Sequence, residues 1–151
     1  MDNLKKYTQP NELEKLSFLW SQARLVVAAV ALFIGGVPPL LAFNPIPGLY
    51  GLLSSLLTLA WIISGAASAY LLYRWQAGGQ MLFGGKNQKD LAAFAVSIIS
   101  GFNLGLTGLL KTNIGMSISS NQLIFIVTGL IYLAAAWHLF QRWNAKNQKV
   151  F

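Results

Sequence analysis

The chain has 151 residues, of which 55% are hydrophobic and 10% are charged, and its mean hydropathy is +0.54. A typical soluble domain has about 25% charged residues, so this composition excludes a disordered chain and argues against an ordinary soluble enzyme. The absence of cysteine excludes disulfides, thiolate nucleophiles and cysteine-ligated metal sites. Eleven Lys and Arg residues against four Asp and Glu residues give a formal net charge of +7, and the length allows one domain.

Residues 11–24 form the first predicted element, a short amphipathic helix. Leu13, Leu16, Trp20 and Ala23 recur at helical spacing, while the polar residues lie off that stripe. We expect this helix to lie in the inner membrane interface and to lead into the first membrane span.

Four uncharged apolar stretches follow, and each contains between 18 and 25 residues. At about 1.5 Å per residue, each can cross a hydrocarbon core of roughly 30 Å, and in lipid such a span must be a helix. We therefore predict an all-α integral membrane protein of four transmembrane helices. The predicted parts are an interfacial segment at 1–24, a membrane domain at 25–140 with spans at 25–43, 49–73, 91–110 and 123–140, and a basic tail at 141–151.

The connections carry fewer signals. Pro38 and Pro39 predict a kink or an early end of the first span near Val37. In the loop between the second and third spans, residues 81–83 are expected to dip into the membrane interface. Asp90 is expected to cap the third span.

The distribution of cations predicts orientation. Ten of the eleven Lys and Arg residues fall on the side of the two termini and the second loop, and Lys111 alone falls on the other side. Cytoplasmic loops hold the excess of Lys and Arg, so both termini are expected to be cytoplasmic, by default in a bacterial inner membrane. Arg24, Arg74 and Arg142 are expected at the inner boundary, in contact with lipid headgroups or a partner protein, and no nucleic-acid partner is expected.

Small residues define a packing strip on the third span. At 100° per residue, Ser97, Gly101, Gly105 and Gly108 share one narrow strip, and Gly65 lies on the corresponding polar face of the second span. Small residues let membrane helices approach closely. These five residues are therefore predicted to pack helix against helix.

Three residues with polar tips fall near the middle of their spans: Trp61, Asn103 and Tyr132. One interpretation is a cluster of interhelical hydrogen bonds that fixes the bundle, each contributing roughly 0.6–2 kcal/mol. The other is a polar constriction or a small-ligand pocket lined by aromatic rings. Asn103 is the residue whose substitution separates the two.

His138 is the single histidine, near the end of the fourth span. With Ala134 four residues before it, the pattern is similar to the Ala-x-x-x-His pattern by which light-harvesting polypeptides ligate chlorophyll-type pigment. The resemblance covers five residues and implies a tetrapyrrole ligand at His138. The alternative is an ordinary interfacial histidine, and no cofactor or metal site is otherwise expected.

The sequence shows no nucleophile–base constellation and no carboxylate inside a predicted span. We therefore expect a non-catalytic membrane subunit or scaffold that packs against lipids, partner membrane proteins or copies of itself. A small homo-oligomeric channel or carrier for a neutral solute is the main alternative. A holin-like permeabiliser and a pigment- or haem-binding subunit are the further hypotheses.

Overall fold

The computed structural model describes residues 10–151, and its regular secondary structure is helical throughout, without a strand in that range. Four long helices dominate the fold: α2 (Pro10–Phe33), α4 (Tyr50–Ala77), α5 (Gln88–Leu110) and α7 (Gln122–Ala145). Three short elements lie in the connections: α3 (Pro39–Ala42), η1 (Pro47–Leu49) and α6 (Ile114–Ile118). All four long helices are long and apolar enough to cross a membrane. The prediction of an all-helical fold with four helices of membrane-spanning length and hydropathy is confirmed for these residues.

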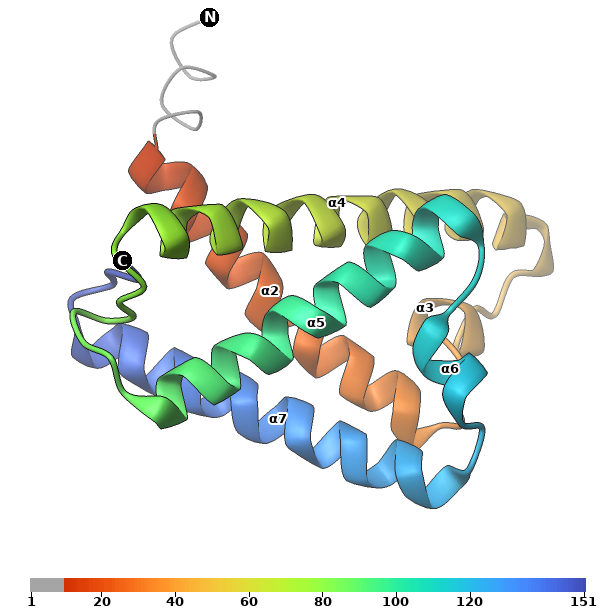
Figure 1. The fold of residues 1–151 in the computed structure, drawn as a ribbon. Helices are drawn as coiled ribbons and strands as arrows, with labels where there is room; N and C mark the ends of the chain where they lie inside the picture. The colour runs from red at the N-terminus through yellow and green to blue at the C-terminus, as the bar shows by residue number, and fades with distance from the viewer. Residues whose placement is uncertain (1–9) are drawn as a thin grey trace, which may run out of the picture.

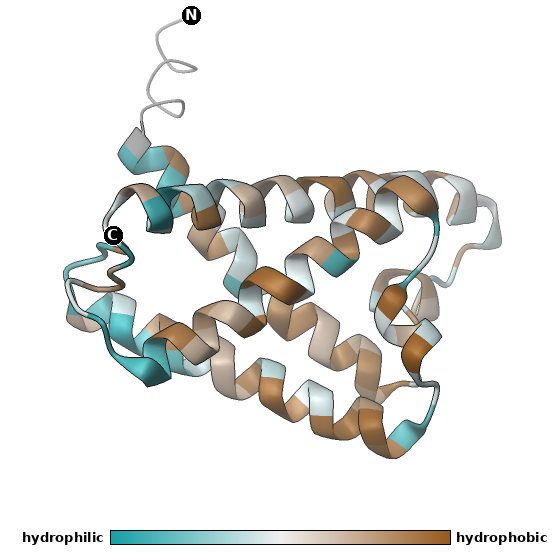
Figure 2. Cartoon of the chain, in the orientation of Figure 1, coloured by the Kyte–Doolittle hydropathy of each residue, from teal (hydrophilic) through white to brown (hydrophobic). Residues whose placement is uncertain are grey.

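The four long helices form a bundle in which each packs between two neighbours. Helix α4 packs against α5 and α2, and α7 packs against α2 and α5 (Figure 1). Apolar residues occupy the middle of the helices, and hydrophilic residues gather at the end of the bundle near the C-terminus (Figure 2). Helices α3 and α6 lie at the opposite end (Figure 1).

The first helix differs from the prediction in its bounds. Helix α2 runs unbroken through the predicted interfacial segment and ends at Phe33, well before the predicted limit of 43. The stop comes from Gly35 and Gly36, whose φ angles of 86° and 84° are left-handed. The Gly36 amide donates to the Ala31 carbonyl at 2.8 Å, a typical helix C-terminal turn. The glycines therefore end the helix before the two prolines are reached.

The apolar stripe predicted on residues 11–24 faces outward. Leu13, Leu16 and Trp20 are exposed on the surface of the bundle, whereas Ser17 and Ser21 of the same helix are buried. The first half of α2 therefore turns the predicted apolar stripe outward and buries Ser17 and Ser21 together with Phe18.

Helices α4 and α5 approach closely through glycine. A Cβ atom built on Gly65 would lie 2.8 Å from the Gly105 Cα, and one on Gly105 would lie 2.7 Å from the Gly65 Cα. A Cβ on Gly108 would lie 2.9 Å from Cγ1 of Ile62 on α4. Gly65 and the glycines of the α5 strip therefore pack against each other within one chain, and their close contact is intramolecular.

The loop after α4 and the C-terminal tail close one end of the bundle. Leu82 and Phe83 are buried in the protein core, and the Phe83 amide donates to the Val150 carbonyl at 2.7 Å. The centroid of the Phe18 ring lies 5.6 Å from the centroid of the Trp143 ring. Residues 82 and 83 were expected at the membrane interface, and that prediction is wrong because the folded-back tail covers them.

Candidate functional site

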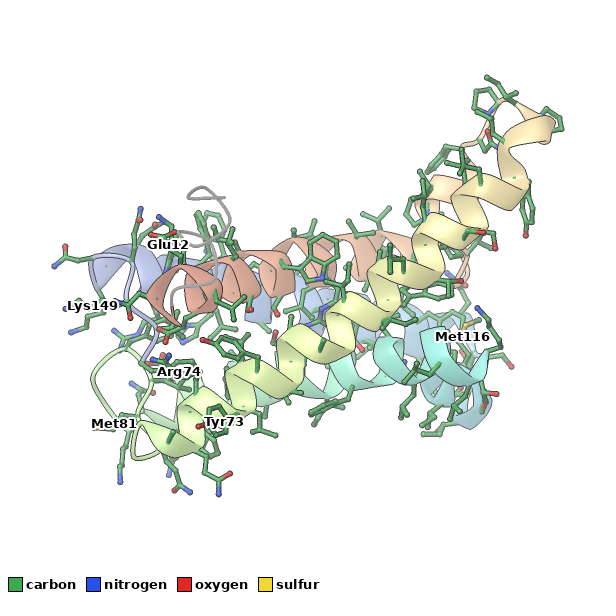
Figure 3. The ribbon with its side chains drawn as sticks, turned by 90° about the horizontal axis from the view of Figure 1, so that it is seen from above. Glu12, Tyr73, Arg74, Met81, Met116 and Lys149 are labelled. Atoms are coloured by element: carbon green, nitrogen blue, oxygen red, sulfur yellow. The ribbon has the colours of Figure 1, made fainter. Side chains whose placement is uncertain are left out.

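A cavity of about 340 Å³ lies between the four long helices, towards the end occupied by α3 and α6. All four long helices and both short helices contribute to its walls, which are mostly apolar. Met116, one of the lining residues, lies at the far end of the bundle from Arg74 and Lys149 (Figure 3). The volume falls within the roughly 300–1,000 Å³ typical of small-molecule sites. The cavity is therefore large enough to hold a ligand.

Trp61, Asn103 and Tyr132 all line this cavity. No hydrogen bond joins the three to one another within residues 10–151. Instead, the Asn103 Nδ2 donates to Asn113 Oδ1 at 3.0 Å, and the Gly115 amide donates to Asn103 Oδ1 at 3.3 Å. Asn103 thereby ties α5 to the loop that carries α6, and the three residues share a cavity rather than a hydrogen-bond cluster.

Arg24 also lines the cavity and is 7% exposed. It lies in the middle of α2, and its Nη2 donates to the Ser97 carbonyl on α5 at 2.7 Å and to Ser97 Oγ at 3.3 Å. Its Nε and Nη1 atoms are buried without a hydrogen-bond partner. The guanidinium thus crosses the bundle from α2 to α5 and is only partly satisfied.

Gly101 leaves room for this guanidinium. A Cβ built on Gly101 would lie 3.1 Å from the Arg24 Cζ and would collide with the side chain of Ser68 on α4. The Ser68 hydroxyl is also buried without a partner. A glycine at this position therefore allows polar groups of α2, α4 and α5 to meet.

Trp20 and Ser64 form a second polar contact in the cavity wall. The Trp20 Nε1 donates to Ser64 Oγ at 3.0 Å, and Ser64 Oγ donates to the Ala60 carbonyl at 2.7 Å. This contact joins α2 to α4 and places the serine hydroxyl beside the lining residues Ala60 and Trp61.

A separate charged cluster lies at the other end of the bundle, where Asp90 is fully buried. The Arg142 guanidinium donates to both Asp90 oxygens, from Nη2 to Oδ2 at 2.8 Å and from Nε to each oxygen at 3.0 Å. The His138 Nε2 lies 2.7 Å from Asp90 Oδ1. Asp90 thereby clamps the start of α5 to the end of α7. The cap of α5 is Asn87, whose side chain accepts from the Lys89 amide, so the prediction that Asp90 caps this helix is wrong.

The other predicted site residues have protein partners as well. Arg74 pairs with Glu14 at 2.8 Å, which joins α4 to α2. The structure thus gives each of the arginines expected at lipid headgroups a contact inside the chain. The His138 atom that a tetrapyrrole metal could use, Nε2, is in contact with Asp90. No group of three or more potential metal ligands occurs within residues 10–151.

Sequence reasoning missed the inward position of Arg24 and the role of Asp90. A signal for Arg24 is present, because Ser17, Ser21 and Arg24 recur at helical spacing and all three are buried. The span predicted from Leu25 onward placed this arginine just outside the membrane. For Asp90 no local signal exists, since its partners are 48 and 52 residues away in the sequence.

Comparison with known protein families, curated proteins and solved structures finds no match to this chain. The class is therefore defined by the fold and the site alone. Residues 10–151 form an all-helical bundle with four helices long and apolar enough to cross a membrane. Its particular feature is a partly open cavity between those helices, with a buried arginine in its wall.

Proposed function

We propose that this chain is a non-catalytic membrane protein that binds a small molecule inside its helix bundle. The observation that supports the proposal is the cavity of about 340 Å³ between the four long helices. Small-molecule sites are mostly apolar with a few fixed polar groups, and this cavity has that character. Its apolar walls are interrupted by polar groups of Trp61, Asn103 and Tyr132.

The proposed orientation places both termini in the cytoplasm, by default at a bacterial inner membrane. Within residues 10–151, seven of the nine Lys and Arg residues lie at the end of the bundle away from α6, which supports this orientation. The first turns of α2 would then lie at the inner interface, and the cavity would lie in the outer half of the membrane.

A subunit role in a larger assembly is the second candidate, and the exposure of α4 favours it. In the membrane-length segment that includes α4, 11% of the residues are buried inside the chain, whereas 28–50% are buried in the corresponding segments of the other three long helices. Its N-terminal end extends away from the rest of the bundle (Figure 3). We propose the outward apolar face of α4 as the surface that would contact a partner's membrane helix or a second copy of this chain.

Native mass spectrometry of the purified chain tests the ligand-binding proposal. Ala60→Leu places a larger side chain into the cavity, whereas Ala66→Leu adds the same bulk to an exposed position of the same helix. We expect a bound small molecule in the wild type and in Ala66→Leu, and its loss in Ala60→Leu. Retention of the same adduct by all three proteins would refute binding in this cavity, and a second polypeptide in fixed stoichiometry would support the subunit role.

A further inference from the structure

Arg24 is a buried cation to which residues 10–151 supply no counter-charge. The guanidinium stays protonated in proteins, and burying a charge is costly unless it is paired and hydrogen-bonded. Ser97 satisfies one terminal nitrogen of Arg24, and its Nε and Nη1 atoms have no partner. Arg24 thus lies in the cavity wall with two buried nitrogens that lack a hydrogen-bond partner.

The described carboxylates do not neutralise Arg24. Glu14 pairs with Arg74, and Asp90 pairs with Arg142. Glu12 lies on the same helix but twelve residues away, a distance of about 18 Å along the axis. Within residues 10–151, no ion pair is formed by Arg24.

The rest of the cavity determines the shape of a molecule that could supply the missing charge. Apart from Arg24, the wall is mostly apolar, with hydroxyl groups at Ser64 and Ser100. A volume of about 340 Å³ accommodates on the order of ten non-hydrogen atoms, at about 30 Å³ for each. A bare inorganic anion would leave the apolar part of this space unfilled, and a two-chain lipid would exceed it.

We infer that the cavity binds a small amphipathic anion, whose headgroup pairs with Arg24 and whose apolar body fills the space towards α6. This inference rests on the proposed function and names the chemical class of its ligand. A carboxylate headgroup can accept a charge-assisted hydrogen bond from a guanidinium N–H group. Gly101 supports the arrangement, because its missing Cβ leaves space for the Arg24 guanidinium.

The experiment uses two brominated probes of matched length, 6-bromohexanoate and 6-bromohexan-1-ol, with the full chain in lipid nanodiscs at neutral pH. Bromine quenches tryptophan fluorescence on contact, and Trp20 and Trp61 both line the cavity. We expect the wild type to bind the carboxylate at least about tenfold more tightly than the alcohol, as a charge-assisted hydrogen bond provides. Hexanoate should compete for the same site.

The variants separate the headgroup from the cavity. Arg24→Gln should reduce the affinity for 6-bromohexanoate by at least about tenfold and leave the affinity for the alcohol within about twofold. Arg74→Gln is the matched control, because it removes an arginine outside the cavity and should change neither affinity. The preference of the wild type decides the question even if Arg24→Gln fails to fold.

Two results would overturn the inference, and they differ in what they say of the proposed function. Equal quenching by the two probes, lost in Ala60→Leu, would overturn the anionic ligand and leave ligand binding in the cavity intact. Quenching that is unchanged in Ala60→Leu for both probes would overturn both proposals.

Discussion

Replacing Asp90 by asparagine should destabilise the bundle, because this carboxylate is fully buried and joins α5 to α7. The substitution keeps the size of the side chain and removes its charge. Asparagine offers one acceptor oxygen in place of two, so it cannot reproduce the bidentate pairing with Arg142, whose three N···O distances are 2.8–3.0 Å. The remaining oxygen must then serve both Arg142 and His138, whose Nε2 lies 2.7 Å from Oδ1.

The magnitude follows from the exposure of the partner. Breaking a fully buried ion pair costs about 3–5 kcal/mol. The Arg142 side chain is 32% exposed and can be partly rehydrated, so we expect a loss near the lower limit, about 3 kcal/mol. For a chain of this length, that loss lowers the unfolding midpoint by about 6–12 °C.

Thermal unfolding in a mild detergent, followed by far-ultraviolet circular dichroism, measures this change. Lys89→Gln is the matched control, because it removes one charge from the exposed neighbouring position and should change stability by less than about 0.5 kcal/mol. Adding Arg142→Gln to Asp90→Asn should cost less than the two single losses combined, with a coupling of about 1–3 kcal/mol. A midpoint for Asp90→Asn that matches the wild type would show that the clamp does not stabilise the fold.

Three further predictions concern the packing, the cavity wall and the orientation. Gly65→Ala should destabilise the bundle by about 1–3 kcal/mol, because its Cβ would lie 2.8 Å from the Gly105 Cα on α5. Gly51→Ala on the same helix is the control, because its Cβ meets no atom within 4 Å and stability should not change. Equal unfolding midpoints for the two variants would contradict the close contact of α4 with α5. Asn103→Leu removes two hydrogen bonds to the α6 loop and should cost about 1–2 kcal/mol in detergent; unchanged stability with altered solute permeation would instead indicate a conducting path. Because the chain has no cysteine, a single introduced cysteine can show on which side of the membrane its position lies. Lys149→Cys should react with a membrane-impermeant maleimide only after the membrane is opened. Ser117→Cys should react with the same reagent in intact cells. The reverse pattern would contradict the proposed orientation.

The sequence was sufficient for the number and type of the spans, because long uncharged apolar stretches have few structural solutions in a bilayer. It was less reliable for the first span. The uncharged apolar stretch places the start of that span at Leu25, since Arg24 is charged and polar residues interrupt the segment before it. The structure continues the same helix back to Pro10 and turns Ser21 and Arg24 towards the other helices. A hydropathy window cannot detect this, because the burial of a charge depends on which helices surround it.

Part of the candidate site could be predicted from the sequence. Trp61, Asn103 and Tyr132 could be singled out because polar-tipped residues are uncommon at the middle of a span. Their placement around one cavity could not be predicted, since it depends on how the helices cross. The partners of Asn103 lie in the loop around α6 and are backbone and amide groups with no signature in the sequence.

The fold treats the buried charges of Asp90 and Arg24 differently, and this difference supports the ligand inference most directly. Both residues are buried, at 0% and 7% exposure. Asp90 has two basic partners from α7, which satisfy it fully. Arg24 donates only to the carbonyl and hydroxyl of Ser97, and neither group can neutralise a guanidinium. Since residues 10–151 supply a counter-charge to Asp90 and none to Arg24, we assign the counter-charge of Arg24 to the small anion inferred for the cavity.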